Sequence, residues 1–232
     1  CGLETDVPAQ VADLYGFPEL EWTPLWSFGP SGAAADPLGT LYLCEGAFTT
    51  HLYRSTDLGE PELLATLSVD ITGLAHGRGN LYGYSNYATP KGIYQIDPAT
   101  GACTAVLDVH TDTGYRFFGL GYNPEDDLFY GFTEYGDSGL YSIDIDTGEM
   151  IRISTGPTSW YGMARGLAVG NNTVYLTATS STDPYFAYDL SQGIDGEWVA
   201  FTNPYDGMQV TGAAAWIPPT GVRSATRSLS EI

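Results

Sequence analysis

A short motif of small residues recurs along the chain and constrains its fold more than any other feature. Its copies are GAAA at 32–35, GLA at 73–75, GLG at 119–121, GLA at 166–168 and GAAA at 212–215. Successive copies lie roughly 40–50 residues apart, a period that is typical of repeat proteins built from one supersecondary unit. The chain is therefore predicted to be an array of similar units.

Three further features follow the small-residue motif at matching offsets in the first four units. They are an apolar–aromatic pair, then a single aromatic position, then an apolar stretch. The pairs stand at 41–42, 81–82, 128–129 and 174–175, the aromatic positions are Tyr53, Tyr94, Tyr141 and Phe186, and the stretches cover 63–67, 102–107, 150–153 and 198–201. With the small-residue motif as the first strand, each unit is predicted to form four short strands.

The turn between the third and fourth strands supports this division. It is DPATG at 97–101 and DIDTG at 144–148, in which Asp can accept backbone N–H bonds and Gly adopts positive φ. Four strands per unit of this length are the pattern of a β-propeller blade. The innermost strands of a propeller crowd around its channel, which explains the small residues, and the aromatic side chains are expected to pack between blades.

The two ends of the chain predict how the ring closes. The motif at 212–215 supplies an inner strand, and the segments 13–17 and 21–28 resemble outer strands. Joining both ends in one blade would remove free sheet edges. We predict an all-β propeller over residues 13–217 with five blades, the last assembled from both termini. Four blades with extra terminal strands are the alternative, and we expect a linker at 1–12 and a tail at 218–232.

The string GIYQIDPATG at 92–101 resembles the repeat of secreted bacterial β-propellers whose blades read LYxID-PATG. The resemblance covers roughly residues 32–216 and is strongest in the second and third units. It implies the propeller fold and an exported protein. Because that broad group includes adhesion and scaffold proteins, the resemblance implies no catalytic residues.

Charge excludes one class of partner. The chain has 8 Lys and Arg against 28 Asp and Glu, a net charge of -20 at pH 7. Such a surface repels phosphate backbones, so nucleic acid is not an expected partner. No apolar run approaches the roughly 18 residues of a membrane span. The single Lys and the many carboxylates favour an extracellular or cell-surface location.

The three cysteines leave several interpretations open. Cys1 followed by Gly2 resembles the start of a mature bacterial lipoprotein, which makes Cys1 a lipidation candidate. The alternatives for Cys1 are a disulfide or an ordinary boundary of the chain. Cys44 and Cys103 either pair with each other or serve as small core residues.

The loops around one mouth of the channel are the expected binding surface, because loops carry function on a rigid scaffold. The loops at 108–118, 154–165 and 202–211 combine aromatic, acidic and Arg side chains, which suits sugars because rings stack on C–H faces while Asp and Arg bond hydroxyls. The alternative is that these side chains seal the loop layer. The predicted binding residues are Asp108, His110, Asp112, Tyr115, Arg116, Trp160, Tyr161, Arg165, Tyr205 and Asp206.

The function expected from these features is that of a non-catalytic, exported binding module with a glycan or protein partner at the loop face. One alternative is a structural subunit of a surface layer or filament that self-assembles through its terminal strands. A second is a carbohydrate-active enzyme. No catalytic residue or metal ligand is assigned, since no nucleophile elbow or phosphate loop occurs. Calcium is the one cofactor considered, at the acidic turns 125–127 and 144–146.

Overall fold

The computed structural model describes residues 31–45, 50–56, 59–109, 116–133, 137–157, 164–178 and 185–201, together with four short strands near the termini. Regular structure in these residues is β, apart from one 3-10 turn, η1 (Leu190–Gln192). No helix in this part of the chain is long and apolar enough to cross a membrane.

Four antiparallel sheets of four strands follow one another along the chain, and in each sheet consecutive strands are neighbours. Blade 1 contains β4 (Gly32–Ala35), β5 (Leu41–Glu45), β6 (His51–Ser55) and β7 (Glu62–Thr66). Blade 2 contains β8 (Gly73–Gly77), β9 (Asn80–Ser85), β10 (Gly92–Ile96) and β11 (Cys103–Asp108).

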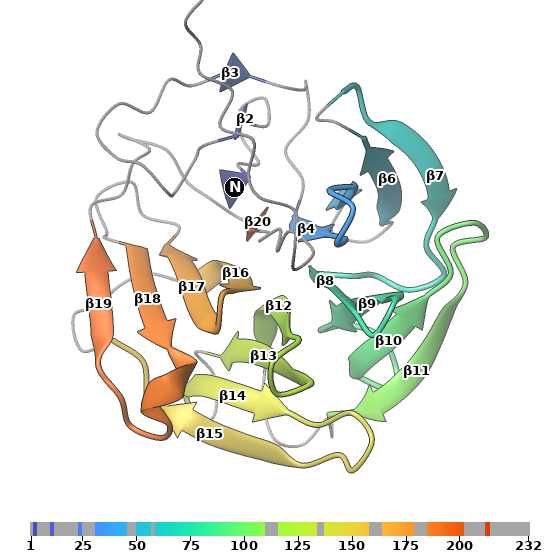
Figure 1. Cartoon of the computed structure of the whole chain (residues 1–232). Coiled ribbons are helices and arrows are strands. Elements are labelled where there is room, and N and C mark those ends of the chain that lie inside the picture. Colours follow the sequence, from blue (N-terminus) through green and yellow to red (C-terminus); the bar gives the residue numbers. More distant parts are fainter. Residues whose placement is uncertain are drawn as a thin grey trace, which may run out of the picture.

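Blade 3 contains β12 (Phe117–Asn123), β13 (Leu128–Thr133), β14 (Gly139–Ile143) and β15 (Met150–Ser154). Blade 4 contains β16 (Ala164–Gly170), β17 (Thr173–Ala178), β18 (Tyr185–Asp189) and β19 (Trp198–Phe201). The blades are arranged around a common centre with β4, β8, β12 and β16 innermost (Figure 1), so the predicted β-propeller is confirmed.

The inner strands are built from the small-residue motif because neighbouring backbones come very close. A Cβ added at Gly119 of β12 would lie 2.6 Å from the backbone nitrogen of Leu167 in β16. One added at Gly73 of β8 would lie 3.1 Å from the Cα of Gly119. Contacts this short exclude larger side chains at these positions.

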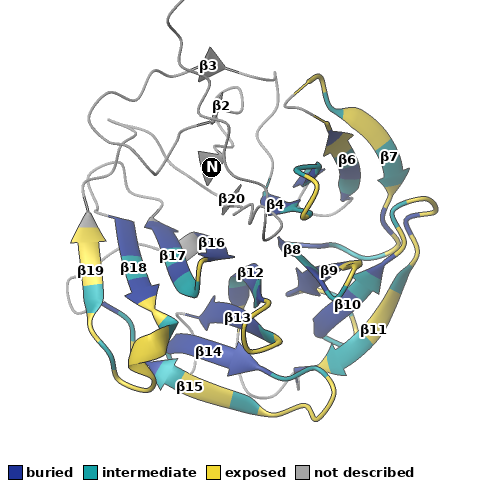
Figure 2. Cartoon of the chain, viewed as in Figure 1, coloured by how far each residue is buried: buried dark blue, intermediate teal, exposed yellow. Residues whose placement is uncertain are grey.

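The apolar core lies between successive blades rather than within any one of them. Three clusters of described residues fill the junctions, and half of the buried residues in the cluster between blades 2 and 3 are aromatic. Its rings meet edge to face, with 5.2 Å between the centroids of Tyr84 and Phe117 and 4.8 Å between those of Tyr82 and Phe129. Burial falls from the inner strands toward the outer strands β7, β11, β15 and β19 (Figure 2).

Four described short strands near the ends of the chain form two pairs. β1 (Gly2–Leu3) pairs with β20 (Gly212–Ala213), and β2 (Gln10–Val11) pairs with β3 (Thr23–Pro24). β20 contacts both β16 and β4, so the C-terminal small-residue motif lies in the ring of inner strands.

The described residues form four complete blades, which is the alternative blade count. A fifth four-stranded blade is not present among them, because the terminal strands are two residues long and form two separate pairs. The segment 1–12, expected to be a linker, contains β1 and β2, and the expected tail at 218–232 lies outside the described residues.

Of the two interpretations left open for Cys44 and Cys103, the disulfide is absent and the role as core residues is observed. Both are free thiols, and Cys44 is fully buried in the cluster between blades 1 and 2, against which Cys103 packs. Burial raises the pKa of the Cys44 thiol to about 12. The two cysteines therefore act as small core residues, while Cys1 lies outside the described part of the chain.

Tyr84 gives a first testable prediction. Its hydroxyl is buried and, apart from the nearby backbone of Phe117, has no hydrogen-bond partner among the described residues. In blade 3, Phe132 follows Gly131 as Tyr84 follows Gly83 in blade 2. Leaving a buried donor unsatisfied costs about 1–3 kcal/mol. We expect Tyr84→Phe to raise the melting temperature by about 2–4 °C, from a gain of about 1 kcal/mol.

Tyr130→Phe is the matched control for this measurement. The Tyr130 hydroxyl donates to Asp126 Oδ2 at 2.6 Å, so its removal should lower the melting temperature. Equal decreases of the melting temperature in Tyr84→Phe and Tyr130→Phe would show that the Tyr84 hydroxyl is hydrogen-bonded in solution.

Candidate functional site

Most of the predicted binding residues lie outside the described part of the chain. These are His110, Asp112, Tyr115, Trp160, Tyr161, Tyr205 and Asp206. Asp108 ends β11 and is exposed, and Arg116 is exposed just before β12, where its backbone N–H donates to Thr133 Oγ1. Arg165 belongs to β16, and its side chain is not described. The binding site predicted on the loop face thus stays a prediction.

Polar side chains that are described on the loop face hold the loops in place. Thr50 Oγ1 donates to Asp70 Oδ1 and accepts from the backbone N–H of Ile71, each at 3.0 Å. Asn86 Nδ2 donates to Thr72 Oγ1 and to the carbonyl oxygen of Phe117. Burial raises the pKa of Asp70. These contacts join neighbouring blades, a structural role that the sequence pattern did not predict.

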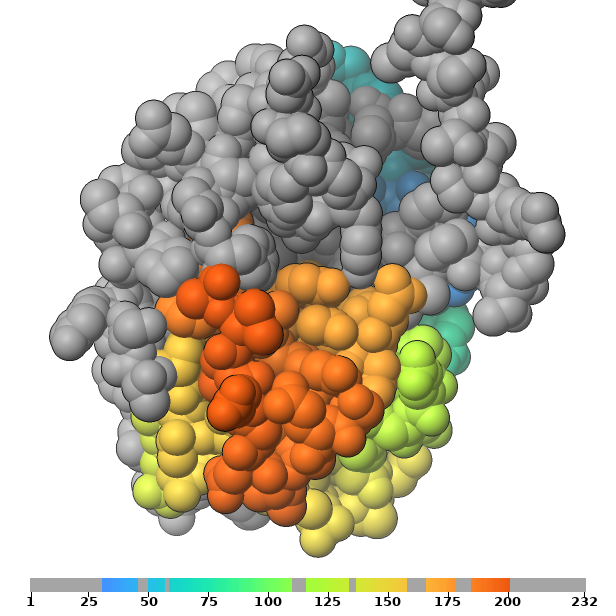
Figure 3. Space-filling model, turned by 60° about the vertical axis from the view of Figure 1, so that its left-hand side comes forward, coloured from blue at the N-terminus to red at the C-terminus, as the bar shows by residue number. Residues whose placement is uncertain are grey.

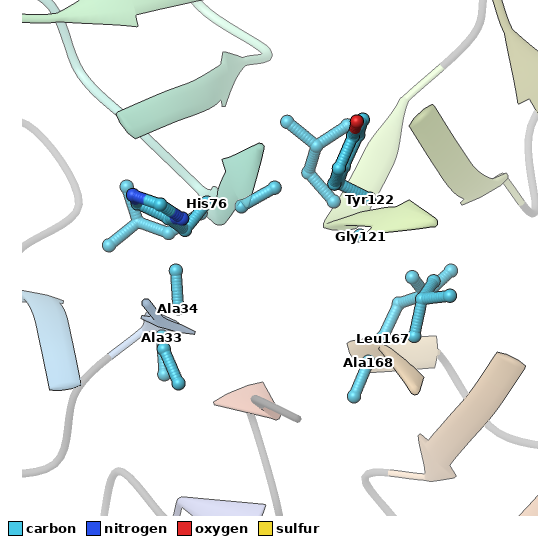
Figure 4. A pocket seen from close by; sticks show the side chains of 12 residues that line it. Ala33, Ala34, His76, Gly121, Tyr122, Leu167 and Ala168 are labelled. Carbon is cyan, nitrogen blue, oxygen red and sulfur yellow. The ribbon is translucent and has the colours of Figure 1, made fainter. Parts of the chain in front are cut away.

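The described inner strands line two small pockets near the central channel, of about 30 and 10 Å³. A single water needs roughly 10–15 Å³ of such space, so these two pockets together hold about two to four waters. Figure 4 shows the larger pocket, with Ala33 and Ala168 on one side and His76 and Tyr122 on the other.

A much larger pocket lies between the outer parts of blades 3 and 4. We call it the outer pocket; it has a volume of about 450 Å³ and is lined by Ser154, Thr155, Gly156, Pro157, Phe186, Asp195, Gly196, Glu197, Trp198 and Ala200. This volume falls within the range of small-molecule sites. The outer face of blade 4, with blade 3 beside it, is shown in Figure 3.

Trp198, at the start of β19, forms a fixed wall of the outer pocket. Its indole Nε1–H donates to Ser154 Oγ at 2.7 Å, which ties β19 to the end of β15. The ring packs against Tyr188, with 5.0 Å between centroids, and meets Phe132 edge to face at 6.4 Å. One hydrogen bond and two ring contacts restrict the indole before any ligand arrives, and the residue stays partly exposed.

The loop 190–197 carries two exposed carboxylates, Asp195 and Glu197, to the rim of the outer pocket. Its backbone is anchored at both blades. The N–H of Asp195 donates to the Ile153 carbonyl oxygen of blade 3, and the N–H of Gly196 donates to the Tyr188 hydroxyl of blade 4, each at 2.8 Å. The side chain of Gln192 also bonds the backbone N–H and C=O of Glu197.

The outer pocket lies where the sequence repeat is interrupted. Blades 2 and 3 join their third and fourth strands through the turns at 97–101 and 144–148, whereas blade 4 uses the longer segment 190–197, LSQGIDGE. The sequence pattern placed Trp198 in a strand and missed Asp195 and Glu197. The departure from the Asp-to-Gly turn pattern was the signal that could have located this site.

The calcium candidates make protein contacts. Arg78 Nε lies 2.7 Å from Asp127 Oδ1 and Arg78 Nη1 lies 2.8 Å from Asp146 Oδ2, which joins blades 2 and 3. The hydrogen bond from Arg78 lowers the pKa of Asp127. In the described part of the chain, no group of three or more His, Cys, Asp or Glu is placed to hold a metal ion. Calcium binding stays a prediction.

Comparison with known proteins concerns the fold. No family model and no curated protein matches the sequence. A chain of a nidogen/laminin complex is similar over 92% of this chain and 96% of its own length, with 13% identity and a TM-score of 0.60. A Bacteroides thetaiotaomicron protein of unknown function is 17% identical over 84% of this chain, with a TM-score of 0.57, and this chain spans 55% of its length.

The solved structure of YjhT is also similar, with 13% identity over 90% of this chain and 71% of its own, and a TM-score of 0.50. At such low identities, these likenesses support the fold and carry no activity over to this chain.

Proposed function

We propose that this β-propeller is a non-catalytic binding module and that the outer pocket is its binding site. One observation carries the proposal: the outer pocket has about 450 Å³, whereas the two pockets near the channel have about 30 and 10 Å³. A rigid aromatic wall with a few polar groups beside it is the usual composition of a recognition site.

The environment of the two carboxylates supports binding rather than catalysis. Asp195 and Glu197 are both exposed to solvent. The general acid of a two-carboxylate hydrolase is usually sheltered, because an apolar environment keeps it protonated near neutral pH. The outer pocket offers no such shelter to either group.

We also propose that the protein is exported from the cell, which the net charge of -20 supports. A glycan or protein partner at the loop face is the alternative to the outer pocket, and the aromatic and acidic residues of the loops support it. Assembly through the terminal strands is the structural alternative. β1 and β20 pair with each other within the chain, so such assembly would have to replace this pairing or add to it.

A substitution that fills the outer pocket tests the proposal. Thr155 is exposed and lines the pocket, so Thr155→Trp should block it without removing a core contact. A panel of saccharides, amino acids and amines is screened by thermal shift, where a ligand at about 100 times its Kd adds roughly 2.7 kcal/mol, or about 5–10 °C. We expect at least one ligand to raise the melting temperature of the wild-type protein and to leave that of Thr155→Trp unchanged.

Thr104→Trp is the matched control, because Thr104 is exposed on the outer strand β11 of blade 2, away from the outer pocket. It should keep the wild-type shifts. Ligands that stabilise both variants equally would place the binding site elsewhere.

A further inference from the structure

We propose that the outer pocket binds an organic ammonium cation. This inference rests on the proposed function, because it names the ligand class of the same pocket. Three observations support it: the negative charge of the lining residues, the position of Trp198 in the lining, and the small number of side-chain hydrogen-bond donors.

Each charged side chain among the described residues that line the outer pocket is a carboxylate. Asp195 and Glu197 contribute two negative charges, and no Lys or Arg lines the pocket in this part of the chain. Arg152 is the cation nearest in sequence, two residues before Ser154, but its side chain lies against Gly139 of β14. With a net charge of -20 on the whole chain, the local field attracts cations and repels anions.

Trp198 adds an attraction that is specific for cations. Its indole N–H is already used by Ser154 Oγ, and the half-buried side chain lines the outer pocket. A cation over a tryptophan face gains about 0.5–2 kcal/mol from the ring quadrupole, and tryptophan is the best of the aromatic side chains for this contact. The fixed orientation of the ring reduces the entropy lost on binding.

Hydrogen-bond donors are scarce among the lining side chains. Among the lining residues that the structure describes, the hydroxyl groups of Ser154 and Thr155 are the sole side-chain donors besides the indole N–H. Ser154 Oγ already accepts from Trp198 Nε1 and from the N–H of Gly156. A neutral sugar needs both hydrogen-bond donors and acceptors for its hydroxyls. An ammonium group instead carries a positive charge, which the two carboxylates and the aromatic ring attract.

The size and apolar walls of the outer pocket define the rest of the ligand. Pro157 and Phe186 line it and are buried, and about 450 Å³ exceeds the volume of a simple ammonium ion. Apolar surface of this kind favours alkyl groups. The ligand class is thus an alkyl-substituted ammonium, as in quaternary amines or methylated lysine side chains.

The test compares choline with 3,3-dimethylbutan-1-ol, which has the same shape and carries carbon in place of the charged nitrogen. Both are titrated into the wild-type protein and followed by calorimetry. We expect choline to bind at least about tenfold more tightly, which corresponds to about 1.4 kcal/mol from the charge. Adding salt should weaken the binding of choline and leave that of the alcohol unchanged.

Variants that each remove one carboxylate test whether the preference for choline arises in the outer pocket. Asp195→Asn and Glu197→Gln should each weaken choline binding by about 1.5- to fivefold, the range expected for an exposed charge pair. Glu149→Gln is the control. It removes the carboxylate that directly follows the turn at 144–148 of blade 3, and it should leave choline binding unchanged because Glu149 does not line the outer pocket.

The outcomes separate the inference from the proposed function. Equal affinities for choline and its neutral isostere would overturn the inference. A saccharide that binds, loses its binding in Thr155→Trp and outcompetes choline would also overturn it, while leaving the outer pocket as the binding site. If no probe depends on Thr155→Trp, both the inference and the proposed function are wrong.

Discussion

Replacing Phe117 by alanine is expected to lower the free energy of unfolding by about 3–5 kcal/mol, the usual cost of removing a buried Phe side chain. Phe117 is 0% exposed and sits at the junction of blades 2 and 3. Its ring meets Tyr84 and Tyr141 edge to face, with centroids 5.2 and 5.9 Å apart. A Cβ at Gly131 would lie 2.7 Å from this ring, so the junction is shaped around it.

Urea unfolding measures this loss, with the midpoint falling and the slope unchanged if the native fold is retained. Leu63→Ala is the control, because Leu63 is apolar but 55% exposed on the outer strand β7. It should cost well under 1 kcal/mol. A loss in Phe117→Ala as small as that in the control would contradict the packing of blades 2 and 3.

Gly119→Ala is expected to lower the melting temperature by about 6–12 °C. The added Cβ would lie 2.6 Å from the backbone nitrogen of Leu167 and 2.7 Å from its Cβ, so strands β12 and β16 would have to separate. Overpacking of this kind costs about 1–3 kcal/mol. At about 2–4 °C per kcal/mol for a domain of this size, its upper end gives the expected shift.

Gly59→Ala is the control for the inner-strand substitution. In the described part of the chain, a Cβ at Gly59 would have a single neighbour within 4 Å, the carbonyl oxygen of Thr56 at 3.2 Å. Its stability should stay within about 0.5 kcal/mol of wild type. Equal melting temperatures for the two variants would show that the inner strands do not meet at backbone distance.

The blades could be predicted from the sequence because their signals are local. The small-residue motif marks the inner strand, since a side chain at Gly73 or Gly119 would press on the backbone of the next inner strand. The turn at 97–101 is stabilised by its own residues: Asp97 accepts from the N–H of Ala99 and from Thr100 Oγ1, and Gly101 adopts a φ of 75°. Hydrogen bonding by Thr100 lowers the pKa of Asp97.

The outer pocket could not be predicted, because it depends on contacts between distant segments. Trp198 and Ser154 are 44 residues apart in the chain, and their hydrogen bond joins two blades. The bond between Arg78 and Asp146 spans 68 residues and was missed for the same reason. Local sequence patterns identify strands and turns. A pocket between two blades depends instead on how a loop that departs from the repeat contacts the neighbouring blade.

The most direct test of the outer pocket as a binding site follows the indole N–H signals of the protein by NMR during a choline titration. The chain has 5 Trp residues, and the signal of Trp198 is identified by its loss in Trp198→Phe. We predict that this signal moves saturably with choline and stays in place in Thr155→Trp. A Trp198 signal that does not move, while that of another tryptophan such as Trp160 does, would contradict the outer pocket and favour the loop face.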